Sequence, residues 1–153
     1  MPSVVDVAGY ILNKYGDTTT MKLQKLTFYA QAAYLAETGE PLLQEDFQAW
    51  QNGPVCPELF RKHRKMFIIR RGALDRNGED PADSLTHRQK EIVDGVVSEL
   101  SRFSGNYLSK KTHSEDPWRQ ARDNLLPTDF CRTVIPKKDI LEYYKNHPVL
   151  QTC

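Results

Sequence analysis

The chain has 153 residues, with 21 Lys and Arg against 20 Asp and Glu and a formal net charge of +1. This length predicts one domain over 1–153 with a single core, and the near-neutral charge excludes a strong overall attraction to nucleic acid or to an anionic membrane. The sequence contains no apolar run of roughly 18 residues that could cross a bilayer, and its N-terminus lacks the layout of a signal peptide.

The cysteines indicate a reduced protein. Cys56, Cys131 and Cys153 are an odd number, lie far apart and include no Cys-x-x-Cys pair. This pattern favours free thiols over a disulfide framework or a zinc site. We therefore expect a cytoplasmic protein that spans no membrane and holds neither a metal nor a cofactor.

A first amphipathic helix is predicted over 4–15. Ser3 and Asp6 form a capping box at its start, because a hydroxyl is followed three residues later by a carboxylate. Gly9 lies inside this helix, where glycine costs about 1 kcal/mol relative to alanine. We therefore expect the helix backbone at Gly9 to approach a neighbouring segment closely.

The longest run without Gly or Pro that carries a strong apolar stripe predicts a central helix at about 20–37. The preceding threonines can cap it, and Gly39 is placed to end it. Its second half is apolar nearly all round, which is typical of a helix packed on several sides. Three polar side chains near its start are predicted to face solvent: Lys22, Gln24 and Lys25.

Turn chemistry separates the next elements. Residues 46–51 fit a short extended segment, and Asn52-Gly53-Pro54 is a strong turn signal because Gly53 is free to adopt positive φ. A third helix is predicted from Pro57, which suits the first helical turn, to Met66. The segment 72–84, rich in Asp, Asn, Gly and Pro, is expected to be a surface loop.

The second half of the chain predicts further short elements. A capping box at Thr86 begins a helix of about four turns that reaches Phe103. We then expect two short helices, a brief strand and a last helix, over 107–111, 117–122, 129–134 and 136–145. The fold class is therefore mainly α: six to seven helices around the central helix, with a minor β ribbon formed by 46–51 and 129–134.

Two irregular segments each place a tryptophan beside a proline-containing turn: 49–55 and 112–118. A folding role for both corners is favoured, because a buried tryptophan removes a large apolar area from water. A groove for a partner is the alternative, since aromatic anchors beside rigid turns suit binding hot spots. The candidate residues in these corners are Trp50, Gly53, Pro54, Val55, His113, Asp116 and Trp118.

The sequence gives little support for an enzymatic activity. His113 with Glu115 and Asp116 is the only cluster that suggests acid–base chemistry, and hydrogen bonding to turn backbone is the favoured role for these residues. The sequence has no nucleophile motif, P-loop, dinucleotide fingerprint or metal-binding histidine spacing. We therefore expect no enzymatic activity.

A basic cluster at 61–71 contains six Lys or Arg residues, including Arg61 and Arg64. It could neutralise nucleic-acid phosphates, as in a phage or prophage accessory protein. The neutral overall charge and the lack of a nucleic-acid-binding motif make this the less favoured hypothesis. The same cluster could steer an acidic protein partner, or simply be a solvated face.

Three motifs, in order, resemble the Panacea antitoxin domain, the family of phage-associated proteins that includes the SocA-like antitoxins. They are Met21-x-Leu-Gln-Lys-Leu-x-Phe-Tyr-Ala-Gln-Ala, Phe47-Gln-Ala-Trp-x-x-Gly-Pro-Val, and the stretch from Leu108 to His113-x-Glu-Asp-Pro-Trp. The resemblance extends from about Val4 to Tyr144. It implies a mostly helical, non-enzymatic module that neutralises a cognate toxin by direct binding. It also implies that the toxin is encoded beside its antitoxin, and that some members deliver their toxin to a protease.

Overall fold

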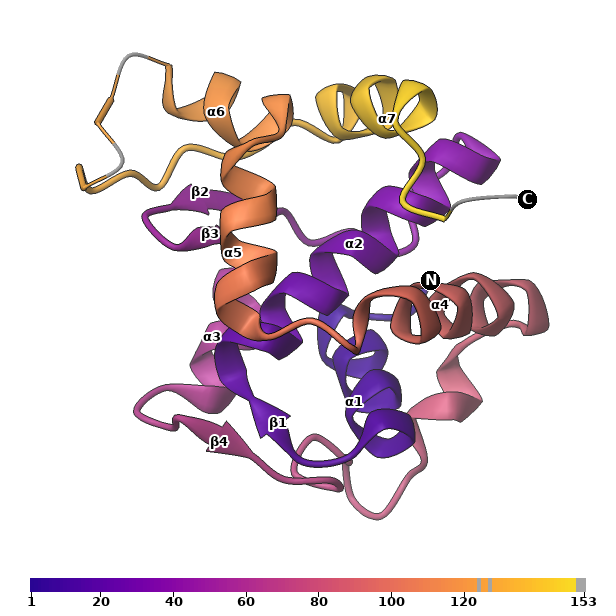
Figure 1. Ribbon diagram of the computed structural model, residues 1–153. Coiled ribbons are helices and arrows are strands. Elements are labelled where there is room, and N and C mark those ends of the chain that lie inside the picture. The colour runs from indigo at the N-terminus through magenta and orange to yellow at the C-terminus, as the bar shows by residue number, and fades with distance from the viewer. Residues whose placement is uncertain (124, 127, 151–153) are drawn as a thin grey trace.

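Seven α-helices dominate the computed structural model, which describes residues 1–123, 125–126 and 128–150 (Figure 1). They are α1 (Val4–Tyr15), α2 (Thr20–Thr38), α3 (Pro57–His63), α4 (His87–Leu100), α5 (Gly105–His113), α6 (Asp116–Arg122) and α7 (Lys137–Asn146). The predicted mainly α fold of six to seven helices is confirmed. Within the described part of the chain, no helix is long and apolar enough to cross a membrane.

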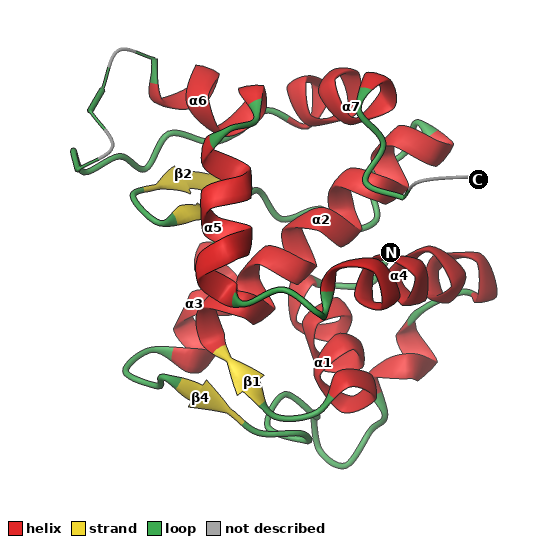
Figure 2. Ribbon diagram, in the orientation of Figure 1, coloured by secondary structure: helices red, strands yellow, loops and turns green. Residues whose placement is uncertain are grey.

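Two small antiparallel sheets complete the fold (Figure 2). One joins β2 (Gln48–Trp50) to β3 (Gly53–Val55) as a tight hairpin. The other joins β1 (Thr18–Thr19) to β4 (Ile68–Ile69) and was not predicted. The second sheet ties the start of α2 to the segment that follows α3.

The central position predicted for α2 is confirmed. Thr19 caps its start by accepting a hydrogen bond from the Lys22 amide, and Gly39 ends it in the left-handed conformation. The helix packs against α1, α4, α5 and α7, and Figure 1 shows it passing through the middle of the molecule. Phe28 anchors the core through edge-to-face contacts with Phe47 and Tyr144.

The prediction that Lys22, Gln24 and Lys25 face solvent is wrong, because all three are buried. α2 is enclosed at its start as well as along its apolar half, by α5 and the β2–β3 hairpin. Burial of these polar groups is tolerated because each meets a hydrogen-bond partner. Lys22 donates to the Ser101 carbonyl at 2.5 Å and to the Tyr15 hydroxyl at 2.7 Å.

Several element boundaries differ from the predicted ones. α3 ends at His63 rather than at Met66, and Lys65 has a positive φ of 68°. Ser104 caps a new helix, so residues 105–106 begin α5 instead of forming only a break between helices. α4 accordingly ends at Leu100, before Phe103.

The expected β ribbon is present in part. Its first segment is the strand β2, whose regular partner is β3 rather than residues 129–134. The second segment forms no strand, but Val134 makes an isolated antiparallel bridge with Gln48. The Ala49 amide also donates to the Thr133 carbonyl at 2.8 Å. Residues 129–134 therefore lie along the outer edge of the hairpin.

The segment 72–84 packs against α1 at the position predicted from Gly9. A Cβ atom at Gly9 would lie 2.9 Å from Cγ of Pro81, so only glycine leaves room for this contact. Leu74 and Pro81 are buried, while most of the segment is exposed. It includes a short 3-10 helix, η1 (Pro81–Ser84), which Asp80 caps through its side chain.

Candidate functional site

The two tryptophan corners identified in the sequence form one corner of the structure. The indole nitrogen of Trp118, at the start of α6, donates to the Trp50 carbonyl in β2 at 2.8 Å. The Arg122 guanidinium lies over the Trp118 ring at 4.8 Å and donates to the Ala49 carbonyl at 2.9 Å. These bonds attach α6 to the β2–β3 hairpin across about seventy residues of sequence.

His113 belongs to the same corner, where its ring stacks on Trp118 with the ring centroids 4.0 Å apart. Its Nε2 atom is buried and has no hydrogen-bond partner among the residues that the structure describes. Burial lowers the pKa of His113, and the charges of Lys25 and Arg122 lower it further. The surroundings of His113 at the edge of the hairpin therefore disfavour its charged form.

The acid–base cluster considered from the sequence is not assembled in the structure. Glu115 instead accepts hydrogen bonds from Tyr29 at 2.5 Å and from Tyr144 at 2.9 Å, and it pairs with Lys111 at 2.6 Å. Asp116 pairs with a different residue, Arg119. Glu115 therefore links α6 to the core, and its carboxylate is satisfied without His113.

Gly53 and Lys25 occupy the space beneath the hairpin together. Gly53 has a φ of 113°, and a Cβ atom there would lie 2.5 Å from Cε of Lys25 and 2.8 Å from Oγ1 of Thr112. The Lys25 ammonium donates to the Pro54 carbonyl at 3.1 Å. The Gly-Pro sequence of the turn thus makes room for a lysine side chain that is only 1% exposed.

A cavity of about 280 Å³ opens beside this lysine, between the start of α2, the hairpin and α3. We call it the Lys25 pocket. Its lining residues come from four segments and are mostly apolar or uncharged: Thr20, Met21, Gln24, Lys25, Trp50, Gln51, Asn52, Val55, Phe60, His63, Phe130 and Cys131.

Three polar residues of the Lys25 pocket, Gln24, Lys25 and His63, are buried and held in place. The Gln24 side chain accepts from the Cys56 amide at 3.0 Å, and its amide nitrogen lies 3.0 Å from Nε2 of His63. Burial lowers the pKa of His63, and the charge of Lys25 lowers it further. Burial also lowers the pKa of Lys25 itself to about 7.

Aromatic side chains form the rim of the pocket. Trp50 contacts Phe60 of α3 edge to face, with the ring centroids 5.1 Å apart. Phe130 is 75% exposed although it lines the pocket. The Arg132 guanidinium lies 4.8 Å from the Phe130 ring and 5.6 Å from the Trp50 ring. The rim therefore combines exposed apolar area with a positive charge.

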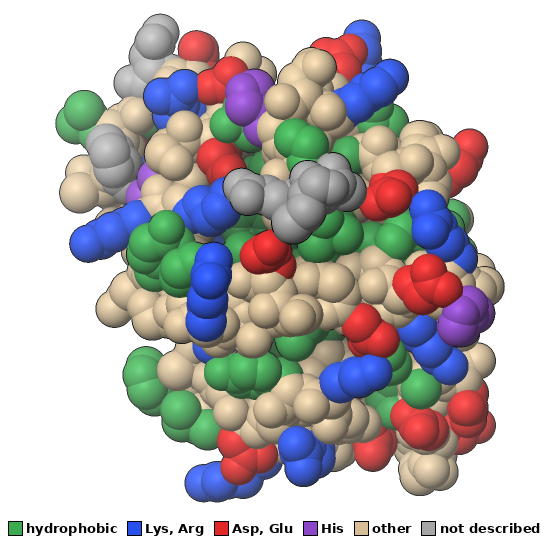
Figure 3. Space-filling model, turned by 45° about the vertical axis from the view of Figure 1, so that its right-hand side comes forward, with side chains coloured by type: hydrophobic (Ala, Val, Ile, Leu, Met, Phe, Trp, Pro, Cys, Tyr) green, Lys and Arg blue, Asp and Glu red, His purple; other side chains and the backbone are tan. Residues whose placement is uncertain are grey.

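Arg61 and Arg64 are exposed and directly follow the pocket residues Phe60 and His63 in sequence. The rest of the basic cluster does not share one helix face, because α3 ends at His63 and the chain turns into β4. Charges of both signs are interspersed on the face drawn in Figure 3. Arg61 and Arg64 are therefore the members of the cluster next in sequence to pocket residues, whereas Arg70 pairs with Asp17.

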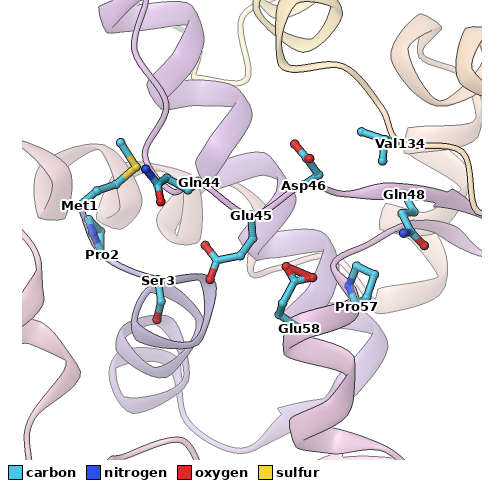
Figure 4. Close-up of a pocket in the computed structure, with 10 residues that line it drawn as sticks. All are labelled: Met1, Pro2, Ser3, Gln44, Glu45, Asp46, Gln48, Pro57, Glu58 and Val134. Carbon is cyan, nitrogen blue, oxygen red and sulfur yellow. The ribbon is translucent and has the colours of Figure 1, made fainter.

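A second, larger cavity of about 590 Å³ lies between the N-terminus and residues 44–48 (Figure 4). Its carboxylates include Glu45 and Glu58, which Figure 4 shows facing the same space. Glu45 accepts from the Val4 amide at 3.2 Å. Among the described residues, no group of three or more His, Cys, Asp or Glu could hold a metal ion.

The Lys25 pocket includes Trp50 and Val55 from the predicted site, with Gly53 and Pro54 packed against its lysine. Asp116 does not line it. The other ten lining residues were not among the predicted site residues, and they include Gln24, Lys25, His63 and Phe130. The sequence offered no signal for Gln24 and Lys25 beyond the family motif that contains them, because helical periodicity assigns these polar residues to solvent.

Comparison with known proteins agrees with the resemblance seen in the motifs. Residues 23–119 match the sequence model of the family described as antitoxin SocA-like, Panacea domain. The chain is 30% identical over 135 residues to antitoxin SocA of Caulobacter vibrioides (strain NA1000 / CB15N), an overlap that covers 76% of this chain and 70% of that protein. No solved structure matches the chain significantly. The chain therefore belongs to the antitoxin SocA-like family with a Panacea domain.

Proposed function

We propose that this protein is an antitoxin that neutralises a cognate toxin protein by direct binding, and that the Lys25 pocket and its rim form part of the contact surface. Family membership supports the antitoxin role. The observation that carries the choice of surface is the aromatic-rimmed pocket, which lies where the first two family motifs pack together.

The surroundings of the pocket suit a protein partner. Thr20, which lines the pocket, donates its amide to the Phe67 carbonyl at 3.0 Å, so the chain beside the pocket carries Met66 and Phe67. Both side chains are exposed, and Phe67 is 76% exposed. Together with Phe130 they provide the aromatic and apolar area that is enriched in the energetically dominant parts of protein interfaces.

Neutralisation would be steric: the bound antitoxin covers a surface that the toxin needs, without turnover. We propose that the toxin is encoded beside this protein. Delivery to a protease requires the same binding step, so the fate of the bound toxin separates the two modes. A pure inhibitor leaves the toxin stable in the cell, whereas a proteolytic adaptor shortens its lifetime.

Co-expression with the products of adjacent reading frames tests this proposal through growth and co-purification. One neighbour is expected to be toxic alone, to be rescued by this protein and to co-purify with it. The double variant Arg61→Glu/Arg64→Glu should weaken rescue at least tenfold in inducer titration, because it reverses the charge that borders the pocket. The matched control Lys138→Glu/Lys145→Glu on α7 should rescue like the wild type.

Three other results of the co-expression and charge-reversal experiments would contradict parts of this proposal. Absence of any toxic or bound neighbour contradicts the antitoxin proposal. Equal rescue by the Arg61→Glu/Arg64→Glu variant and the wild type contradicts the proposed surface and moves the interface elsewhere. Retention of DNA or RNA that both arginine substitutions abolish would instead support the nucleic-acid hypothesis for the basic cluster.

A further inference from the structure

We propose that the Lys25 pocket is a carboxylate-binding site, and that it receives an Asp or Glu side chain flanked by an aromatic or apolar residue of the partner protein. This inference rests on the proposed function for the identity of the partner. The choice of a carboxylate as the ligand rests on the geometry of the pocket and does not depend on the antitoxin role.

Lys25 is a buried cation with unused donor capacity. Its ammonium has three N–H donors, and the Pro54 carbonyl is its hydrogen-bond partner among the described residues. The side chain is 1% exposed yet lines a cavity of about 280 Å³. Because Lys25 is only 1% exposed, its remaining N–H groups reach a ligand in this cavity only when the lysine side chain or the pocket wall shifts.

The groups that face Lys25 are neutral or basic. Among the described residues that line the pocket, none is Asp or Glu. Lys25 lowers the pKa of His63 on α3 and of His113 on α5, and Arg122 on α6 is a further cation near His113. The hairpin contributes the Pro54 carbonyl. The buried carboxylate of Glu115 is already held by Tyr29, Tyr144 and Lys111.

A buried charge without an opposite charge is costly, and a carboxylate placed beside it removes much of that cost. The attraction is strong here because a buried pair is poorly screened by water and salt. Trp50, Phe60 and Phe130 surround the entrance, so an apolar residue next to the carboxylate would complete the exclusion of water. Arg61, Arg64 and Arg132 would attract an acidic segment toward this entrance.

Three N-acetylated dipeptides test the ligand chemistry in NMR titrations of the protein. Acetyl-Glu-Phe-amide carries the proposed side chain, acetyl-Gln-Phe-amide lacks its charge, and acetyl-Gln-Phe with a free terminus carries only a terminal carboxylate. The first peptide is expected to shift the amide signals of residues 48–55 and to bind at least tenfold more tightly than the second. Its affinity should fall about tenfold between pH 6 and pH 8, as Lys25 with a pKa of about 7 loses its proton.

Variants identify the residue responsible. Lys25→Met and Lys25→Gln should both abolish the preference for the Glu peptide, and Lys25→Gln keeps a donor for the Pro54 carbonyl in case the Met variant is perturbed. Lys22→Met is the matched control, because Lys22 is buried on the same helix but bonds to Tyr15 and Ser101. Exposed Lys138 on α7 provides a second control, Lys138→Met.

Equal binding of the Glu and Gln peptides, or a preference that survives both Lys25 substitutions, would overturn the proposal. Selective binding of the free-terminus peptide alone would overturn the choice of a side-chain carboxylate. The outcomes are separable from the antitoxin role. Rescue of a toxic neighbour without peptide selectivity refutes the carboxylate site only, and selectivity without any toxic or bound neighbour refutes the proposed function only.

Discussion

The side chain of Lys25 is buried in the protein interior and also lines the cavity that we propose as the binding site. It is enclosed by the hairpin and α2, yet it borders the cavity in which we place the partner. Its burial is a cost to folding that an aliphatic side chain would not impose. Lys25 is therefore a residue whose removal is expected to help stability while it harms binding.

This cost predicts a pH-dependent stability difference between Lys25→Met and the wild type. The pKa of Lys25 is about 7 in the folded state and 10.5 ordinarily, so between these values the unfolded state holds more protons and wild-type stability rises with pH. Lys25→Met lacks this rise. In urea unfolding, the stability of the variant relative to the wild type should be greater at pH 7 than at pH 9.5 by about 3 kcal/mol.

The control for this measurement is Lys138→Met, which removes an exposed lysine from α7. Its free energy of unfolding should track that of the wild type across the same pH range. A difference between Lys25→Met and the wild type that stays constant with pH would contradict the lowered pKa of Lys25. It would leave the binding proposal to be decided by the peptide titrations.

The β2–β3 hairpin is a secondary-structure element whose position depends on contacts with distant parts of the chain. Three features hold it in place: the isolated bridge to Val134, the bond from Trp118 to the Trp50 carbonyl, and the Lys25 ammonium on the Pro54 carbonyl. Each comes from a segment distant in sequence. The hairpin is therefore positioned by α2, α6 and residues 129–134 rather than by its own short ladder.

Gly53→Ala is expected to disturb this element severely. The new methyl group would lie 2.5 Å from Cε of Lys25 at a φ of 113°, whereas Gly39→Ala has φ 78° and no atom within 4 Å of the added Cβ. Thermal or urea unfolding should show a loss of about 3 kcal/mol for Gly53→Ala and about 1 kcal/mol for Gly39→Ala. Equal losses in the two variants would mean that Lys25 does not pack beneath the hairpin.

The elements also show what local sequence can and cannot predict. The capping boxes at Ser3 and Thr86 are present in the structure, and Gly9 marks a real close contact. Each capping box depends on two residues three positions apart in the sequence. A glycine inside a helix indicates a close contact because it lacks a side chain. The β1–β4 sheet was missed because strands of two residues carry no alternation that could be recognised.

The burial of Lys22, Gln24 and Lys25 could not be predicted from helical periodicity. That pattern assigns polar residues to solvent unless a partner is known. Here the partners of Gln24 and Lys25 are backbone groups about thirty residues away, at Cys56 and Pro54. The Lys25 pocket was unpredictable for the same reason, although the motifs that form it were recognised.

The distribution of exposed apolar residues gives the whole molecule a preferred side for a partner. Phe67 and Phe130, the two most exposed phenylalanines, lie beside the Lys25 pocket or line it. Figure 1 shows α3, β4 and the β2–β3 hairpin on the left side of the molecule and α4 and α7 on the right side. We therefore expect the partner to cover the hairpin, α3 and residues 128–135, and to leave α4 and α7 free.

Hydrogen–deuterium exchange of the protein alone and bound to the toxin identified by co-expression tests this central claim most directly. We predict slower exchange in peptides covering 47–69 and 128–135, with peptides covering α4 and α7 unchanged. The Lys25→Met variant should show weaker protection at the same toxin concentration. Protection confined to α4 and α7, with 47–69 unchanged, would contradict the Lys25 pocket as the toxin-binding surface.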